Sequence, residues 1–163
     1  MKALLIVAHS RTGGTLQMAE AAADGARGEQ GVTVRLIDAC DTHAGDVLAA
    51  DGYIFATPEY LAAMAGMMKD FFDRTYYAAL DRVAGRPYAA LICAGSDGTG
   101  AARQIDRIAT GWRLRTIADP LIILTHAQTP EAILAPKRIA STDLDKCREL
   151  GLAMAAGLAL RIY

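Results

Sequence analysis

The feature that most limits how this chain of 163 residues can fold is a set of five short apolar runs. Stretches that suit helices separate them. Each run is continuous rather than alternating, which is typical of strands buried on both faces of a sheet. Such strands, alternating with helices, predict an α/β fold with one doubly wound, five-stranded parallel sheet in the order 2-1-3-4-5. The runs are KALLIVA at 2–8, VTVRLI at 32–37, GYIFAT at 52–57, PYAALICA at 87–94 and PLIILT at 120–125.

The stretches between and after the runs are long enough for helices and contain no repeat, low-complexity tract or linker. We therefore expect a single domain over residues 1–163. The longest irregular segment, 126–142, contains Pro130 and Pro136, which prevent a continuous helix, and its length favours a functional loop. Helices are predicted at 14–27, 46–50, 65–80, 101–112 and 143–161.

Charge and cysteine content exclude several classes of protein. A net charge of −1 gives no overall field to attract nucleic acid or an anionic membrane. The apolar run near the start is too short for a signal peptide, and no run reaches membrane-spanning length. Cys40, Cys93 and Cys147 lack CxxC or Cys/His ligand spacing, so we expect reduced thiols in a cytoplasmic protein and no metal site.

The stretch SRTGGT, at 10–15, lies between the first strand and the first helix. In an open parallel sheet, ligands bind beyond the carboxyl ends of the strands, where the winding reverses. Gly13 and Gly14 allow a tight turn, and the helix adds unpaired N–H groups and a partial positive charge. With the hydroxyls of Ser10, Thr12 and Thr15, the turn could hold a phosphate. The alternative is that a threonine merely caps the helix.

Other phosphate loops of similar composition do not match. A Walker loop needs a lysine after Gly14, and a dinucleotide turn needs GxGxxG after the first strand; neither is present. The glycines of GSDGTG at 95–100 stand in the wrong order. A phospho-receiver domain needs paired acids after the first strand and an aspartate after the third, and this chain has neither. A low-molecular-weight phosphatase needs an arginine five residues beyond its cysteine, and no arginine stands five residues beyond Cys93.

Three segments together resemble a known family. SRTGGT resembles the hydroxyl-x-Thr-Gly-x-Thr phosphate loop of flavodoxin-like proteins, which bind FMN. ATPEYLAAMAGMMKDFFDR, at 56–74, resembles the second flavin loop and following helix of the flavodoxin-like NAD(P)H:quinone and FMN reductases. AGSDGTGA, at 94–101, resembles their third flavin loop. The resemblance covers nearly the whole chain, with the three loops in the same order.

The resemblance implies an FMN site made of these three loops. Where related sequences often have a glycine followed by a polar or aromatic residue, this chain has Ala62 and Ala63, which bears on flavin affinity and leaves Tyr60 as the nearest aromatic candidate for stacking. The implied residues are Ser10, Arg11, Thr12, Gly13, Gly14 and Thr15 around the phosphate, Thr57, Pro58, Glu59, Tyr60 and Leu61 along one side of the ring and ribityl chain, and Gly95, Ser96, Asp97 and Gly98 on the other.

The implied activity is that of an FMN-dependent oxidoreductase of the quinone or flavin reductase type. NADH or NADPH would donate hydride to FMN, which would reduce a quinone or similar small acceptor without a dedicated catalytic acid, base or metal. His126, after the fifth strand, could donate to a quinone oxygen or simply cap the loop. Two alternatives are a flavodoxin-type electron carrier, against which the small net charge counts, and a flavodoxin-like binding or regulatory domain with little turnover.

Three further groups of residues have both structural and functional interpretations. Segment 150–162 is apolar nearly all the way round, which predicts coverage by another subunit and hence a homo-oligomer. A helical face at 64–72 is interpreted as core or subunit interface, and a set of arginines as solvated charges or as a grip on the NADPH phosphate. The first set is Met64, Met67, Met68, Phe71 and Phe72, and the second is Arg103, Arg107, Arg113 and Arg115.

Overall fold

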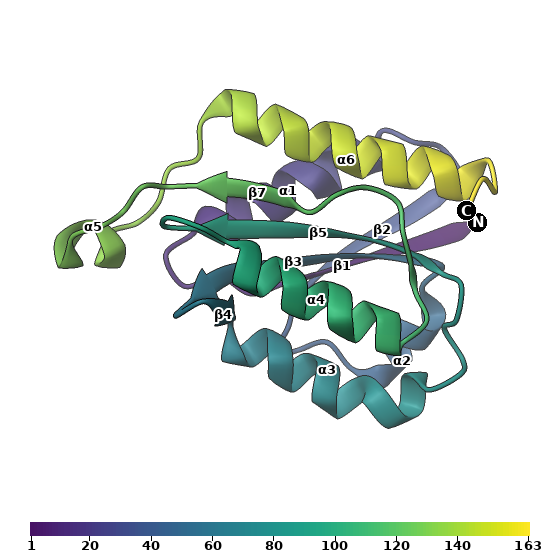
Figure 1. Cartoon of the computed structure of the whole chain (residues 1–163). Coiled ribbons are helices and arrows are strands. Elements are labelled where there is room, and N and C mark those ends of the chain that lie inside the picture. Colours follow the sequence, from purple (N-terminus) through teal and green to yellow (C-terminus); the bar gives the residue numbers. More distant parts are fainter.

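The computed structural model describes residues 1–163 and contains one twisted, mainly parallel sheet with helices on both faces (Figure 1). The path across the sheet is β2-β1-β3-β5-β6, and β7 also pairs with β5. The predicted order 2-1-3-4-5 is therefore confirmed, with β6 and β7 sharing the fifth position. The strands are β1 (Lys2–Ala8), β2 (Val32–Asp38), β3 (Gly52–Tyr60), β4 (Ala63–Met64), β5 (Pro87–Ala94), β6 (Arg115–Thr116) and β7 (Leu121–Leu124).

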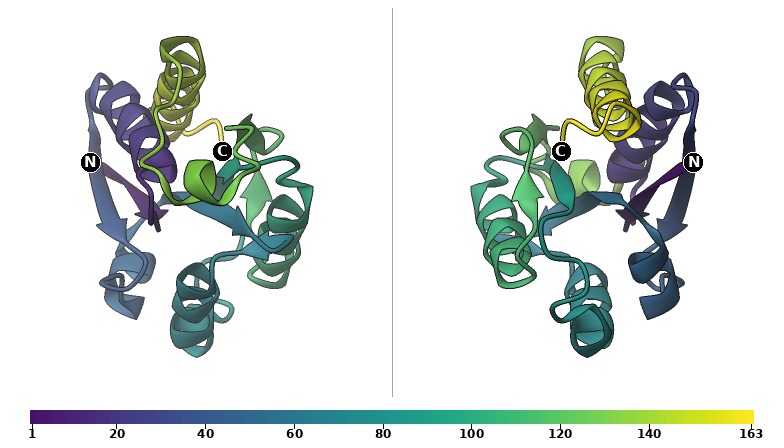
Figure 2. Two further views of the ribbon diagram at one scale, coloured as in Figure 1. Left: turned by 90° about the vertical axis from the view of Figure 1, so that its left-hand side faces the viewer. Right: turned by 90° about the vertical axis from the view of Figure 1, so that its right-hand side faces the viewer.

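The helices form two layers (Figure 2). One face of the sheet packs against α1 (Gly14–Arg27) and α6 (Ser141–Ala159), where Met18 and Met154 belong to one buried cluster. The other face packs against three helices through a second cluster around Phe55, which includes the buried part of the 64–72 face and confirms its core interpretation. These three are α2 (Ala44–Ala49), α3 (Gly66–Ala79) and α4 (Thr99–Gly111).

The expectation that all five strands are completely buried is confirmed at the centre of the sheet and is wrong at its edges. β5 is buried throughout. In β2, however, Thr33 and Arg35 are exposed, and in β7 only Ile123 is buried. An edge strand has one neighbour instead of two, and the helical layers cover it less completely. An apolar run is therefore necessary but not sufficient for a fully buried strand.

Most predicted boundaries agree within two residues, and two segments differ in kind. β3 continues to Tyr60 because it pairs with β4 in an antiparallel hairpin, where a loop was expected after Thr57. Within 126–142, a short helix α5 (Pro130–Leu134) forms where an irregular segment was predicted. Proline is favoured in the first turn of a helix, and the Thr129 hydroxyl oxygen accepts a hydrogen bond from the Ala132 N–H at 3.2 Å.

The apolar character of the last helix is largely explained by α1 of the same chain. The α6 residues Cys147, Gly151 and Met154 are buried, and a Cβ on Gly151 would overlap the Ala22 carbonyl, so the two backbones approach closely. Leu152 remains 46% exposed. This helix therefore gives less support to subunit contact than expected, and a homo-oligomer stays a prediction. No helix combines the length and the apolar character that crossing a membrane requires.

Candidate functional site

Four segments gather at the carboxyl edge of the sheet, on the left of Figure 1. They are the turn at 9–15 after β1, the β3–β4 hairpin, the turn at 95–98 after β5, and the segment 125–140 after β7. Because β1, β3, β5 and β7 are parallel, their carboxyl ends lie along the same edge. The fold thus brings together all three predicted cofactor loops and adds a fourth segment to them.

The turn after β1 has many donors without acceptors. Gly13 adopts a left-handed conformation (φ 92°), and its N–H donates to Ser10 Oγ at 3.1 Å. The N–H groups of residues 11, 12 and 14–16 donate to no acceptor in the chain, and the first turn of α1 contains no acidic residue. The buried Thr15 hydroxyl makes no hydrogen bond either. Donors converging at the positive end of a helix suit an anion.

The turn after β5 begins α4 with nearly the same backbone but different partners. Gly98 (φ 87°) precedes α4 as Gly13 precedes α1. Here Glu59 accepts the N–H of Gly98 at 2.9 Å and that of Ala101 at 3.0 Å, and Asp97 accepts that of Thr99 at 3.3 Å. Two carboxylates therefore already occupy this helix terminus. Of the two turns, the one before α1 is the one left open to an anionic ligand.

Two of the predicted site residues, Thr57 and Glu59, hold the β3–β4 hairpin in place. Thr57 is buried, and its hydroxyl donates to the Pro58 carbonyl at 2.9 Å and accepts the Ala65 N–H at 3.1 Å. The Glu59 carboxylate accepts the N–H groups of Gly98 and Ala101 at the start of α4. The side chains of Thr57 and Glu59 thus fix the hairpin, while Tyr60 and Leu61 are 38% and 101% exposed at its tip.

The tip of the hairpin is strained. Leu61 and Ala62 both have positive φ, 49° and 64°, in a two-residue connection that usually favours asparagine and glycine. Each such residue costs about 1–2 kcal/mol relative to an ordinary conformation. Ala62 stands where related sequences often have glycine, and glycine would adopt this conformation without strain. The Gln104 side chain, which accepts the Met64 N–H at 2.8 Å, and Glu59 hold the hairpin in this shape.

The third predicted loop presents backbone donors to solvent. The N–H groups of residues 95–97 donate to no acceptor in the chain, and Ser96 and Asp97 are exposed. The Gly95 carbonyl accepts the backbone N–H of His126 at 2.9 Å. His126 itself is exposed, has a φ of 57° and makes no side-chain hydrogen bond. The backbone of His126 is therefore joined to the third loop, and its imidazole is free of partners within the chain.

Sequence reasoning missed Gln17 and Lys137, which attach the fourth segment to the first loop. The Lys137 N–H donates to the Thr12 carbonyl at 2.7 Å, and the Gln17 amide donates to the Lys137 carbonyl at 2.8 Å. The same Gln17 side chain accepts the Ile139 N–H at 3.1 Å. No spacing signal could have indicated this contact, because Gln17 and Lys137 are 120 residues apart. The segment 125–140 thus forms a wall beside the first loop.

Two ionisable groups beside the first loop have shifted pKa values. Burial raises the pKa of the Cys93 thiol, although the positive charge of Lys137 acts in the opposite direction. Burial likewise raises the pKa of Tyr60, while the Arg11 guanidinium lowers it. Both side chains are therefore neutral near pH 7. A neutral thiol under Gly14, where a Cβ would come within 2.7 Å of its sulfur, does not repel an anion in the loop.

The four arginines do not form one group. Arg103 and Arg107 line a groove of about 640 Å³ between α4 and the start of α3, together with Lys69. Arg113 forms an ion pair with Asp81 at 3.0 Å, and Arg115 lies in β6, beside the amino end of β5. Only the first two could contribute to binding near the hairpin, and the interpretation of all four as one phosphate grip is wrong.

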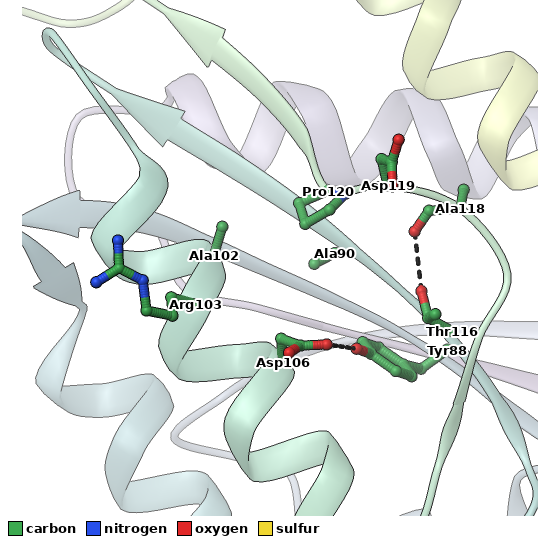
Figure 3. A pocket seen from close by; sticks show the side chains of 9 residues that line it. All are labelled: Tyr88, Ala90, Ala102, Arg103, Asp106, Thr116, Ala118, Asp119 and Pro120. Carbon is green, nitrogen blue, oxygen red and sulfur yellow. Dashed lines mark hydrogen bonds between the residues drawn. The ribbon is translucent and has the colours of Figure 1, made fainter.

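A separate pocket of about 190 Å³ lies where the fifth strand is interrupted (Figure 3). Its walls are β5, α4 and the connection between β6 and β7, and none of the predicted FMN-binding residues lines it. In it, the Tyr88 hydroxyl donates to Asp106 Oδ1 at 2.9 Å. Burial, and then the Asp106 carboxylate, raise the pKa of Tyr88 to about 12.

The Tyr88 shift predicts a loss of stability at high pH. Because the folded pKa lies above the ordinary value of about 10, the neutral Tyr88 hydroxyl contributes to the free energy of unfolding. This contribution is complete below pH ~10 and is lost as the pH rises through ~12. In Tyr88→Phe, we expect the free energy of unfolding to fall by about 1 kcal/mol less than in the wild type between about pH 8 and about pH 11. Urea unfolding at about pH 8 and about pH 11 measures the difference. Tyr77→Phe, at an 85% exposed position, is the control; equal slopes in wild type and Tyr88→Phe would contradict the prediction.

With the fold and these loops in place, comparison with known proteins identifies the class. Residues 1–129 match the family described as NADPH-dependent FMN reductase, and the chain belongs to this family of FMN-binding, flavodoxin-like proteins. It resembles a flavodoxin of Aquifex aeolicus (strain VF5), with 40% identity over 73 residues that span 45% of this chain and 40% of the relative.

A second relative and a solved structure agree with this class. The NAD(P)H dehydrogenase (quinone) of Acidithiobacillus ferrooxidans (strain ATCC 53993 / BNL-5-31) is 35% identical over 95 residues, which span 46% of this chain and 48% of that protein. The chain thus spans less than half the length of either curated relative. A solved flavodoxin from the domain Archaea has the same fold, with a TM-score of 0.80, 23% identity and coverage of 96% of this chain and 98% of that one.

Proposed function

We propose that this protein is an FMN-dependent NAD(P)H oxidoreductase that passes electrons to a quinone or a similar small acceptor. The observation that carries the proposal is the turn at 10–15, whose N–H groups and buried Thr15 hydroxyl have no partner in the chain. Membership of an FMN reductase family supports FMN as the ligand, and the name of the quinone dehydrogenase relative supports a quinone as acceptor.

The donors in the first loop fit the phosphate of FMN. A phosphate monoester carries a charge of about −1.5 to −2 at pH 7 and offers three strong acceptor oxygens. The N–H groups of residues 11, 12 and 14–16 would donate to these oxygens, with hydroxyl donors from Ser10, Thr12 and Thr15. The exposed Arg11 and the positive end of α1 favour the charge. Phosphate would thus satisfy the buried Thr15 hydroxyl, which costs free energy when unpaired.

The hairpin and the third loop would hold the ring of the flavin. The N–H groups of residues 95–97 are free to donate to ring carbonyls, and Tyr60 offers an aromatic face at the hairpin tip. Glu59 and Thr57 would act indirectly, because they fix the hairpin against α4 and α3. His126 and the segment 125–140 would limit access of water from the side of β7.

FMN, when bound, supplies the redox chemistry, accepting hydride from NAD(P)H and passing electrons to the acceptor. The chain's residues would bind the phosphate, orient the ring and leave one side of it accessible. No side chain is required to act as a catalytic acid or base. Arg103 and Arg107, together with Lys69, line a cationic groove next to the hairpin that suits the phosphates of the nicotinamide nucleotide.

The proposal is tested first by the visible absorption spectrum of the purified protein and by fluorescence titration with FMN, FAD and riboflavin. We expect FMN to bind tightly and riboflavin much more weakly, because riboflavin lacks the phosphate. The loaded protein should then oxidise NADH or NADPH steadily when a quinone is added. Absence of flavin binding would overturn the whole proposal, whereas tight FMN binding without turnover would overturn only the enzymatic part.

A second candidate function is that of an electron carrier, which the name of the Aquifex relative favours. Such carriers dock to partner proteins through strong complementary charge, and the net charge of −1 gives little support for that mode. Reductive titration separates the two functions. Two well-separated one-electron steps, without NAD(P)H turnover, would favour the carrier, and steady NAD(P)H consumption would favour the reductase.

A further inference from the structure

We propose that His9, Asp38 and Cys40 form a binding site for a divalent transition-metal ion of the zinc class. One potential ligand atom from each of the three side chains lies within 4.8 Å of the other two. The cluster adjoins the first cofactor loop but uses none of its predicted phosphate-binding residues. The three residues come from two different strand ends, so the site exists only in the folded protein.

The pairing of β1 with β2 brings these residues together. The two strands are parallel, and Ala8 is paired in register with Asp38. His9 follows Ala8 directly, so its side chain and that of Asp38 project from neighbouring carboxyl ends. The Ala39 N–H continues the ladder by donating to the Ala8 carbonyl at 2.8 Å. The chain then turns, with the Thr42 N–H donating to the Asp38 carbonyl at 3.0 Å, and Cys40 in this turn lies beside both side chains.

The turn that carries Asp38 and Cys40 is held rigidly. Asp38 Oδ1 accepts the Cys40 N–H at 2.8 Å, which fixes the carboxylate beside the Cys40 thiol. The Thr42 hydroxyl donates to the Asp38 carbonyl at 2.8 Å. From α3, the Arg74 guanidinium donates to the carbonyls of Thr42 at 3.0 Å and Ala39 at 2.6 Å. These bonds order the ligands before a metal binds, which reduces the entropy lost on binding.

The imidazole of His9 has an unsatisfied nitrogen. Its Nδ1 is buried and makes no hydrogen bond in the chain. An unpaired buried polar atom costs free energy, and a ligand bound to this nitrogen would remove that cost. The observation is independent of the spacing of the three side chains. It shows that one ring nitrogen of His9 has no partner in the chain.

The ligand set determines the type of ion. Thiolate, imidazole and carboxylate together are typical of Zn²⁺ and its neighbours among the transition metals, whereas Mg²⁺ and Ca²⁺ take oxygen ligands. Bonds of about 2.0–2.3 Å in tetrahedral geometry separate the ligand atoms by about 3.5 Å. Binding would require side-chain rotations that bring the ligand atoms, now within 4.8 Å of one another, to that separation. Exposure of Asp38 and Cys40 leaves the fourth position open to water.

The proposal is tested on the full chain, reduced and free of any affinity tag, with Zn²⁺ and Co²⁺ as probes. Calorimetry with Zn²⁺ should give one ion per chain. Co²⁺ should produce a thiolate charge-transfer band and weaker bands to the red of flavin absorption. We expect Cys40→Ser and His9→Gln to lower Zn²⁺ affinity at least about tenfold, because even indirect ligand partners contribute that much. His43→Gln, which removes an exposed imidazole outside the cluster, is the matched control.

The variants also separate loss of the site from loss of the fold. Cys40 is exposed, so Cys40→Ser should keep the circular dichroism spectrum and FMN affinity of the wild type. Absence of saturable Zn²⁺ binding to the wild type would overturn the proposal. So would equal affinities in the wild type and Cys40→Ser, or a Co²⁺ spectrum without the thiolate band. None of these results depends on whether the protein turns over NAD(P)H.

Discussion

Replacing Leu16 by glutamate is expected to weaken FMN binding by about tenfold to a hundredfold while leaving riboflavin binding unchanged. Leu16 is the third residue of α1, is 42% exposed, and its N–H is among those without an acceptor. Like charges about 8 Å apart at a protein surface repel by about 2 kcal/mol. A carboxylate here would oppose the phosphate and compete for the same donors. Fluorescence titration with both ligands measures the two affinities.

The same substitution should not destabilise the protein in the absence of ligand. An acidic side chain in the first turn of a helix is favourable by about 0.3–1 kcal/mol, and the first turn of α1 has none. Stability and FMN affinity should therefore change in opposite directions. Leu16→Gln, of similar size but uncharged, controls for the lost leucine. An equal loss of FMN and riboflavin affinity in Leu16→Glu would contradict phosphate binding at this turn.

The features that could be predicted from the sequence are those that depend on neighbouring residues. A strand buried on both faces needs a continuous apolar run, so β1, β3 and β5 were found by composition alone. The turn at 10–15 was recognised because glycines and hydroxyls stand together after such a run. In both cases the physical requirement acts over a few consecutive residues, and any chain that meets it shows the pattern.

The features that could not be predicted depend on contacts between distant residues. Glu59 binds the N–H of Gly98, 39 residues away, and nothing near Glu59 indicates that partner. The His9–Asp38–Cys40 cluster has no ligand spacing because the strand register assembles it. The hairpin at Leu61 and Ala62 lacks the usual turn residues, since its shape is imposed by contacts with α4 rather than by local preference.

The second large effect is expected at Glu59. Its two carboxylate oxygens accept the N–H groups of Gly98 and Ala101 and so join the hairpin to the start of α4. Hydrogen bonds to charged groups contribute about 1.5–3 kcal/mol each, and removal leaves donors at the helix terminus without a protein partner. We expect Glu59→Ala to lower the free energy of unfolding by about 2–3 kcal/mol in urea denaturation. Glu59→Gln, which keeps one acceptor oxygen, should lose less.

Asp97 provides the matched control because it is an acidic residue at the same helix terminus. Its carboxylate is exposed and accepts the N–H and hydroxyl of Thr99, so Asp97→Ala should cost no more than about 1 kcal/mol. Equal losses in Glu59→Ala and Asp97→Ala would contradict a bridging role for Glu59. In the proposed site, release of the hairpin should also weaken FMN and riboflavin equally, because both have the ring. Leu16→Glu and Glu59→Ala would then act on opposite ends of one ligand, and only the first would depend on the phosphate.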